Sequence, residues 1–182
     1  MKALILGGAR SGKSRLAEQW ALRWQQRHEG NEVVYVATSE PADAELEKRV
    51  ASHRARRPES WGLVEEPLTL AEVLKAQAAP QRCLLVDCLT LWLTNLLMLE
   101  NEARMHAELQ ALQTTLPTLP GQILLVSNET GLGVVPMGEL TRRYVDEAGL
   151  LHQALAQQCD TVVLTVAGLP HVLKGSLTEL DR

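Results

Sequence analysis

Residues 7–14, which read "GGARSGKS", constrain the fold of this chain more than any other stretch. They fit the pattern G-x-x-x-x-G-K-[ST], with Gly7, Gly12, Lys13 and Ser14 at the specified positions. Glycine has no Cβ, so the backbone of such a loop can fold closely around an anion. When a helix follows, its first N–H groups have no partner within the helix and point toward the same anion. The pattern therefore predicts a phosphate-binding loop between a strand and a helix.

The sequence on either side of this loop has the required character. Residues 2–6, "KALIL", are typical of a short buried strand. After the loop, Leu16, Trp20 and Trp24 recur every four residues, which predicts a helix over 14–28. The order of strand, glycine-rich loop and helix is therefore the one that a phosphate-binding loop needs.

The residues of the loop have distinct expected tasks. Lys13 is expected to reach the β- and γ-phosphates of a nucleotide, and the Ser14 hydroxyl to ligate Mg²⁺. The alternative is a glycine-rich turn that binds nothing, which the full pattern in its strand-to-helix context disfavours. The nucleotide-binding residues predicted from the loop are Gly7, Gly8, Ala9, Arg10, Ser11, Gly12, Lys13 and Ser14.

Strand and helix patterns alternate along the rest of the chain. Strands are predicted at 32–37, 61–66, 82–87, 122–127 and 161–166. Helices are predicted at 42–57, 68–79, 137–159 and 89–116, the last as one long helix or two. This alternation predicts a single α/β domain over residues 1–182, of the P-loop NTPase type, with a mostly parallel β-sheet and helices on both faces. Ligands of such sheets bind at the carboxyl ends of the strands.

Composition limits the classes of function. Apolar residues make up 46% of the 182 residues, enough for a full core, and the formal net charge of −4 argues against nucleic acid as a partner. The three cysteines, an odd number without the spacing of metal ligands, indicate reduced thiols and a cytoplasmic protein. No apolar stretch approaches the roughly 20 residues of a membrane span, and the N-terminal "MKALIL" is too short for a secretory signal.

Polar residues follow the predicted strands. Asp87 directly follows the run "CLLV", the position at which P-loop sites place an acid that holds Mg²⁺ or its water. We therefore expect Ser14 and Asp87 to hold the metal, partly through water. The alternative is an ordinary acidic strand end. Ser39 and its neighbour Thr38 follow the second strand with hydroxyls suited to a nucleotide or phosphate. The run "ILLV" is followed by the candidate cleft residues Asn128 and Glu129.

A histidine lies among arginines in the predicted helix 42–57. Arg49, His53 and Arg57 are four residues apart and so share one helical face. One interpretation is a solvated basic helix end, which the helix dipole favours. The other is a histidine that attacks phosphorus while the arginines neutralise the charge on the phosphoryl oxygens. The residue pattern alone leaves both interpretations open.

Taken in order, five stretches resemble one enzyme family. They are "GGARSGKSRLAE", "VYVATS", "RVASHRARRP", "LLVDCLTLWLTNLL" and "VSNETGLGVVP". From about residue 3 to residue 168 the chain resembles the bifunctional adenosylcobinamide kinase / adenosylcobinamide-phosphate guanylyltransferase family of cobalamin biosynthesis, and the tail 171–182 stays unassigned. The phosphate loop is shared by many enzymes, whereas the histidine–arginine stretch and "NETGLGVVP" are far more specific.

The resemblance implies two reactions and a homotrimer. ATP or GTP phosphorylates the aminopropanol hydroxyl of adenosylcobinamide; GMP then passes from GTP through a covalent guanylyl-histidine, which gives adenosylcobinamide-GDP and pyrophosphate. On this chain the histidine is His53, which joins Lys13 and Asp87 as a catalytic residue. The further nucleotide contacts expected here are Ala37, Thr38, Ser39, Arg54, Ala55, Arg56, Arg57, Glu65 and Asp87.

Two alternative functions account for less of the sequence. A P-loop kinase of another small molecule, without the guanylyltransferase step, explains the phosphate loop and Asp87 but leaves His53 without a task. A nucleotide switch is disfavoured because such switches commonly read guanine with an N-K-x-D motif, and the sequence contains none. Covalent labelling by GTP separates the first alternative from the bifunctional enzyme.

Overall fold

The computed structural model describes residues 1–39 and 58–177 of the chain. Its strands are Lys2–Gly7 (β1), Glu32–Ala37 (β2), Gly62–Glu65 (β3), Arg82–Asp87 (β4), Gln122–Asn128 (β5), Thr161–Val166 (β6) and Leu169–Lys174 (β7). Its helices are Lys13–Arg27 (α1), Leu70–Gln77 (α3), Leu89–Met98 (α4), Glu102–Thr115 (α5) and Glu139–Gln158 (α6), with a short 3₁₀ helix at Leu116–Thr118 (η1). The predicted helix 42–57 lies outside the described residues.

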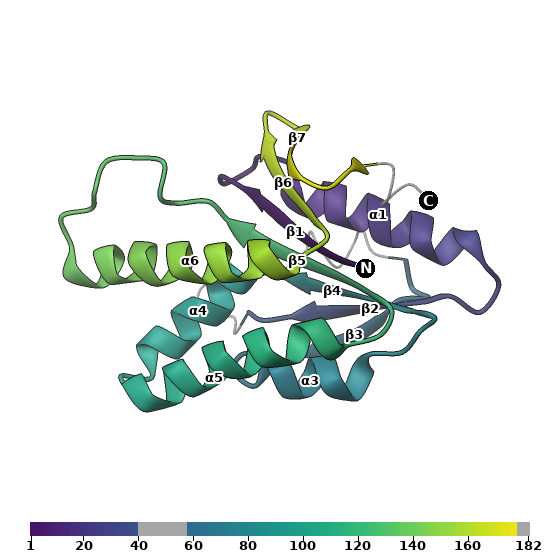
Figure 1. Cartoon of the computed structure of the whole chain (residues 1–182), viewed down its shortest axis with the longest axis horizontal. Helices are drawn as coiled ribbons and strands as arrows, with labels where there is room; N and C mark the ends of the chain where they lie inside the picture. The colour runs from purple at the N-terminus through teal and green to yellow at the C-terminus, as the bar shows by residue number, and fades with distance from the viewer. Residues whose placement is uncertain (40–57, 178–182) are drawn as a thin grey trace.

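The strands form one seven-stranded sheet in the order β3-β2-β4-β5-β1-β6-β7. Neighbouring strands are parallel in every described pair except β6 and β7. Helix α1 covers one face of the sheet, and α3, α4, α5 and α6 cover the other (Figure 1). The predicted fold class, an α/β domain with a mostly parallel sheet and helices on both faces, is confirmed.

The sheet separates two apolar cores, because side chains alternate between its faces. On β1, Leu4 and Leu6 pack into the core under α3 to α6, whereas Ala3 and Ile5 pack against α1. All four are nearly inaccessible to solvent. A strand that is covered on both faces needs apolar residues at successive positions, which is why this strand reads as an unbroken apolar run.

The stretch predicted as one long helix or two is two helices. Helix α4 ends at Met98, Glu100 adopts a positive φ of 51°, and Asn101 precedes α5. The Asn101 side chain accepts a hydrogen bond from the backbone N–H of Arg104 at 3.0 Å, which is the geometry of a helix N-cap. The break lets α5 turn back so that both helices cover the same face of the sheet (Figure 1).

The sheet contains one strand that the sequence patterns did not predict. Strand β7 pairs antiparallel with β6 across Ala167 and Gly168. Both turn residues have positive φ, 52° and 80°, as in a type I′ hairpin turn, but the pair "AG" is a weaker signal of that turn than "NG" or "DG". Because β7 is an exposed edge strand containing Pro170, it lacks the apolar run of a buried strand. Residues 171–174 of the unassigned tail therefore belong to the sheet.

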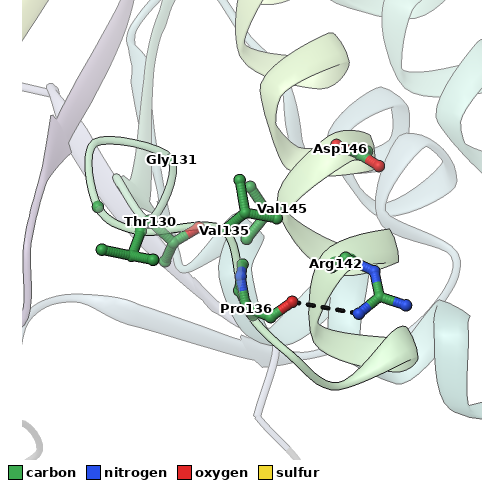
Figure 2. A pocket seen from close by; sticks show the side chains of 9 residues that line it. Thr130, Gly131, Val135, Pro136, Arg142, Val145 and Asp146 are labelled. Atoms are coloured by element: carbon green, nitrogen blue, oxygen red, sulfur yellow. Dashed lines mark hydrogen bonds between the residues drawn. The ribbon is translucent and has the colours of Figure 1, made fainter.

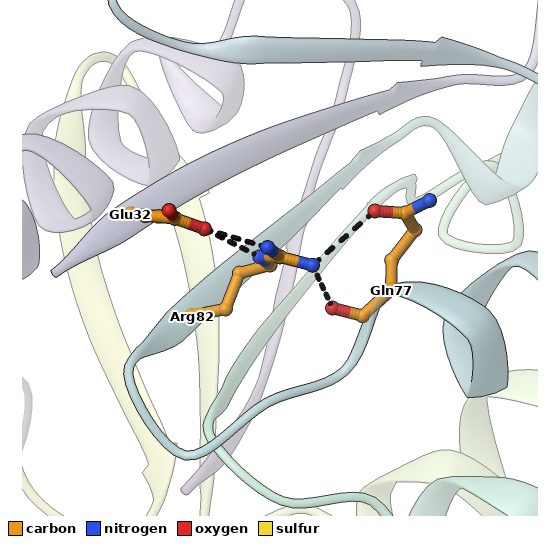
Figure 3. Close-up of polar contacts among 3 residues, drawn as sticks. All are labelled: Glu32, Gln77 and Arg82. Carbon is orange, nitrogen blue, oxygen red and sulfur yellow. Dashed lines mark hydrogen bonds and ion pairs between the residues drawn. The ribbon is translucent and has the colours of Figure 1, made fainter.

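Arg82 ties together three elements at the amino edge of the sheet, opposite the phosphate loop. Its Nε and Nη2 donate to Glu32 Oε2 at 2.9 and 2.6 Å, which joins β4 to β2. Its Nη1 donates to the Gln77 carbonyl at 2.9 Å and so holds the end of α3 (Figure 3). The Glu32 side chain is 61% exposed, so water screens the ion pair and limits its stabilising effect.

We expect Arg82→Ala to lower the free energy of unfolding by about 1 kcal/mol, the upper end for a screened pair that also loses a bond to a carbonyl. Urea denaturation measures this change, with Lys75→Ala as the control because Lys75 is an exposed cation on α3. Nucleotide binding by the folded variant should be unchanged, since Arg82 lies at the edge away from the phosphate loop. A folded Arg82→Ala protein with impaired nucleotide binding would contradict this separation of the two edges.

Candidate active site

The glycine-rich loop joins the carboxyl end of β1 to the start of α1, as the sequence predicts. The backbone N–H of Ser11 donates to the Gly8 carbonyl at 3.2 Å, and the first turn of α1 begins with Leu16 N–H donating to the Gly12 carbonyl at 2.9 Å. Gly12 occupies the N-cap position with φ at 99°, and no side chain caps this end of the helix. The first N–H groups of α1 are therefore available to an anion in the hollow of the loop.

The close folding of the loop requires glycine at position 7. A Cβ there would lie 2.4 Å from Ser11 Oγ and 2.6 Å from the Thr165 carbonyl oxygen, both too close for real atoms. Gly8, Ala9 and Arg10 form the exposed tip of the loop, whereas Ser11 is buried beneath it. The loop therefore has an open side and a packed side, as a cradle for a bound group needs.

The charges of Lys13 and Asp87 interact across the site. The Lys13 ammonium donates to the Gly8 carbonyl at 3.2 Å, over the loop. Burial lowers the pKa of Lys13, and the Asp87 carboxylate acts in the opposite direction, so the two charges are near enough to interact. The Tyr35 hydroxyl donates to Asp87 Oδ2 at 3.0 Å and orients this carboxylate. A cation and an acid beside a phosphate cradle are the parts that phosphoryl transfer requires.

The strand order spreads the predicted contacts along one edge of the sheet. Asn128, at the end of β5, pairs in register with Gly7 of β1. With neighbouring strands about 4.8 Å apart, Asp87 on β4 is about 10 Å from β1 and Glu65 on β3 about 19 Å. The phosphate loop and Glu65 therefore lie far apart along the carboxyl edge, and only an extended ligand reaches both. Ala37, on β2, lies between them.

Thr38, predicted as a nucleotide contact, has a structural role at the end of β2. Its side chain is fully buried, and its hydroxyl donates to the Cys88 carbonyl at 2.7 Å and accepts from the Cys88 N–H at 3.0 Å. Asn95 Nδ2 donates to the Thr38 carbonyl at 2.8 Å. The Thr38 hydroxyl therefore ties the end of β2 to the end of β4. Ser39 is partly exposed beside it.

The predicted cleft residues Asn128 and Glu129 lie directly beside the phosphate loop. The N–H of Glu129 donates to the Gly7 carbonyl at 3.0 Å, and the N–H of Asn128 donates to Thr90 Oγ1 at 2.7 Å. Glu129 Oε1 accepts the N–H of Gly131 at 2.6 Å. The sequence stretch "NETG" is thus tied to the phosphate loop at one end and to its own carboxylate at the other.

A buried histidine of α6, which the sequence patterns did not single out, supports this stretch. His152 Nε2 lies 2.8 Å from Ser127 Oγ, and its Nδ1 lies 3.8 Å from Glu129 Oε2. Burial lowers the pKa of His152, although the Glu129 carboxylate opposes the shift, so the neutral imidazole is favoured. The only signal was its position in the apolar stripe of α6 beside Leu151 and Leu155, where a histidine needs a polar partner from elsewhere in the fold.

Several predicted residues lie outside the described part of the chain. They are His53, Arg54, Ala55, Arg56 and Arg57. Within residues 1–39 and 58–177, no group of three or more His, Cys, Asp or Glu side chains gathers as a metal site. The same residues contain no helix long and apolar enough to cross a membrane. All three cysteines are buried free thiols, and burial raises the pKa of Cys88 to about 11.

A glycine-rich loop between the first strand and the first helix, at the carboxyl edge of a mostly parallel sheet, places this chain in the class of P-loop NTPase-like α/β proteins. A model of the family described as cobinamide kinase / cobinamide phosphate guanyltransferase matches residues 3–173. The chain belongs to this family. The match extends past residue 168, the end of the resemblance seen in the sequence stretches, and takes in nearly all of β7.

Curated relatives agree with this assignment. The chain is 60% identical over 175 residues to the bifunctional adenosylcobalamin biosynthesis protein CobP of Pseudomonas aeruginosa PAO1, covering 96% of this chain and 98% of the relative. It is 36% identical over 182 residues to the bifunctional adenosylcobalamin biosynthesis protein CobU of Escherichia coli K12, covering 93% and 97%. The CobU protein of Salmonella typhimurium LT2 matches to the same extent.

One solved structure shows the fold alone. It comes from a structural study of a Pyrococcus horikoshii OT3 protein and superposes with a TM-score of 0.54 at 9% sequence identity. The superposition covers 98% of this chain and 88% of the other. At this identity the likeness supports the α/β architecture and carries no statement about activity.

The place of Thr38 leads to a test of its role. We expect Thr38→Val to lower the free energy of unfolding by about 2 kcal/mol. The buried N–H of Cys88 loses its acceptor, and the Cys88 carbonyl keeps only the N–H of Trp92 at 3.3 Å. Urea denaturation measures the change, and Thr38→Ser, which keeps the hydroxyl, is the matched control and should lose less. Stability unchanged in Thr38→Val, together with weaker nucleotide binding, would show that the hydroxyl serves the ligand after all.

Proposed function

We propose that this protein phosphorylates the aminopropanol hydroxyl of adenosylcobinamide and then converts the phosphate to adenosylcobinamide-GDP. The observation that carries the proposal is the Lys13 ammonium, which donates to the Gly8 carbonyl of the phosphate loop and lies close enough to Asp87 for the two charges to interact, in a chain whose family name includes both activities. The relatives named above are likewise described as bifunctional. ATP or GTP serves the first reaction and GTP the second.

In the first reaction the substrate hydroxyl attacks the γ-phosphorus of the nucleotide. The bond from this phosphorus to the β–γ bridging oxygen breaks, the hydroxyl proton is released, and a nucleoside diphosphate leaves. Such transfers depend on positioning and on neutralising charge. Backbone N–H groups at the start of α1 hold the phosphates, and Lys13 stabilises the negative charge that develops on the leaving diphosphate.

In the second reaction a ring nitrogen of His53 attacks the α-phosphorus of GTP and pyrophosphate leaves. A phosphate oxygen of the substrate then attacks the same phosphorus, the phosphorus–nitrogen bond breaks, and the free imidazole returns. The arginines at 54, 56 and 57 are proposed to neutralise the phosphoryl oxygens. This role is proposed on the sequence stretch "SHRARRP", which the plain-kinase alternative leaves unexplained.

Residues at the phosphate loop fit a magnesium ion held chiefly by the nucleotide. Mg²⁺ keeps several waters and uses one or two carboxylates together with substrate phosphates, so it does not need a cluster of protein ligands. Asp87 supplies one carboxylate, and Ser14 supplies a hydroxyl in the first turn of α1. When bound, the ion would neutralise phosphate charge and help to align the γ-phosphate.

Ala37, Ser39 and Glu65 lie along the carboxyl edge where the nucleoside would extend away from the loop. A homotrimer is proposed from the family resemblance. A cytoplasmic location is proposed because three buried free thiols suit a reducing compartment.

Lys13→Ala should abolish most of both reactions, because each proposed transfer places negative charge beside this ammonium. We expect a loss of about 100-fold or more in kcat for each, the usual effect of removing one group that stabilises the transition state. Kinase and guanylyl transfer are assayed separately, with exposed Lys75→Ala as the control. Near-normal activity of Lys13→Ala in either assay would separate that reaction from the phosphate loop.

The decisive experiment on the second reaction is intact-protein mass spectrometry after incubation with GTP and Mg²⁺. We expect the mass to rise by one GMP with release of pyrophosphate, and the label to be labile in acid and stable in base, as a phosphoramidate is. Labelling should weaken as the pH falls below roughly 6.5, the ordinary pKa of histidine, because only the neutral ring attacks.

His53→Asn should abolish this label and the overall guanylyl transfer. It should leave the kinase reaction measurable, because that transfer runs directly from the nucleotide to the substrate hydroxyl. Kinase activity is therefore the internal control for folding and nucleotide binding. Full guanylyl transfer by His53→Asn, or GMP found on a different residue, would leave a plain small-molecule kinase as the better account of this protein.

A further inference from the structure

The segment between β5 and α6 exposes an unusual concentration of apolar side chains. Among the described residues, five of the large apolar side chains open to solvent fall within nine positions. Val134 and Met137 are almost wholly exposed, at 96% and 95%. The five, called here the apolar loop surface, are Leu132, Val134, Val135, Met137 and Leu140.

This segment is anchored at both ends rather than loosely attached. At its start, Gly131 N–H donates to Glu129 Oε1, whose backbone is bonded to Gly7 of the phosphate loop. At its end, Arg142 Nη1 donates to the carbonyls of Pro136 and Met137. The polar groups thus hold the backbone while the apolar side chains point outward, and Figure 1 shows the segment projecting beyond the sheet at the start of α6.

The apolar loop surface is continuous with the phosphate site. It begins three residues after Glu129, which lies against Gly7. On the other side of the phosphate loop, the β6–β7 turn bonds to it through Gly168 N–H and the Ser11 carbonyl at 2.8 Å. That turn carries the exposed apolar residues Val166 and Leu169. The place where a phosphate is transferred is therefore bordered by apolar surface on both sides.

A small pocket between the loop and α6 adds a polar contact to this surface. It has a volume of about 90 Å³ and is lined by Val134, Val135 and Val145 with Arg142 and Asp146 (Figure 2). Pockets for whole drug-sized ligands measure about 300–1,000 Å³, so this one is too small for a nucleotide or a macrocycle. A cation, a carboxylate and apolar walls in so small a space suit a single primary amide group.

We propose that the apolar loop surface is the docking site for the macrocycle of the corrinoid acceptor. This inference rests on the proposed function, which supplies a substrate with methyl-bearing ring faces, several amide arms and one longer arm ending in the reactive hydroxyl. The ring rests on the loop and covers its apolar side chains, one amide arm enters the pocket beside Arg142, and the longer arm extends over Gly7 to the γ-phosphate.

Chemical complementarity favours the corrinoid over the nucleotide as the occupant. A nucleotide is a polyanion, and its phosphates are held by N–H groups and cations at the loop of residues 7–14. Contiguous exposed apolar surface marks a binding site for an apolar partner. The acceptor must also reach the γ-phosphate from outside the phosphate loop, which is where the apolar loop surface lies.

The test is equilibrium dialysis of adenosylcobinamide against the whole protein. The visible absorption of the corrinoid measures how much is bound. We expect the double variant Val134→Ser, Met137→Ser to raise the corrinoid Kd about tenfold or more, from the apolar area lost to contact. The KM for the corrinoid should rise in parallel while kcat at saturation is kept. Leu150→Ser on α6, which removes an exposed leucine away from the loop, is the matched control and should bind as the unmodified protein does.

Guanylylation by GTP alone distinguishes failure of this inference from failure of the proposed function. That half-reaction needs no corrinoid, so the double variant should be labelled as fast as the unmodified protein. Unchanged corrinoid affinity in a labelled double variant overturns the docking site and leaves the function intact. If the double variant loses self-association in analytical ultracentrifugation while its corrinoid affinity is unchanged, a second copy of the chain covers the loop and the inference is equally overturned.

Discussion

The pairing of β1 with β5 on one side and β6 on the other is the constraint on which the site depends. It places the phosphate loop near the middle of the carboxyl edge and packs Gly7 against Thr165 and Ser11. Because β1 is buried on both faces, the loop is held by two cores at once. Rigidity at this point matters, since transferring groups must be positioned within fractions of an ångström.

The two edges of the sheet are organised for different purposes. At the amino edge, Arg82 joins β2, β4 and α3 through bonds that leave it partly exposed. At the carboxyl edge, polar groups hold other polar groups in place: Tyr35 orients Asp87, and His152 lies against Ser127 behind Glu129. Buried polar networks of this kind are costly unless satisfied, so their concentration beside the phosphate loop indicates a constraint from function.

Much of the fold could be predicted because buried parallel strands and a phosphate loop leave strong local patterns. Strand β7 was missed because an exposed edge strand leaves a weak one. The roles of Thr38 and His152 could not be predicted for a different reason. Their partners, Cys88 and Ser127, are 50 and 25 residues away in the sequence, so only the assembled sheet shows that these side chains serve one another.

A single phosphate loop can serve both proposed reactions because the leaving group of each contains the β-phosphate. In phosphoryl transfer the attack is on the γ-phosphorus, and negative charge develops on the oxygen that leaves with the β-phosphate. In guanylyl transfer the attack is on the α-phosphorus, and charge develops on the opposite side of the same β-phosphate. A cation held near the β-phosphate, as Lys13 is proposed to be, therefore stabilises both transition states without moving. Only the nucleophile changes: the acceptor hydroxyl must approach the γ end of the triphosphate, and the histidine the α end.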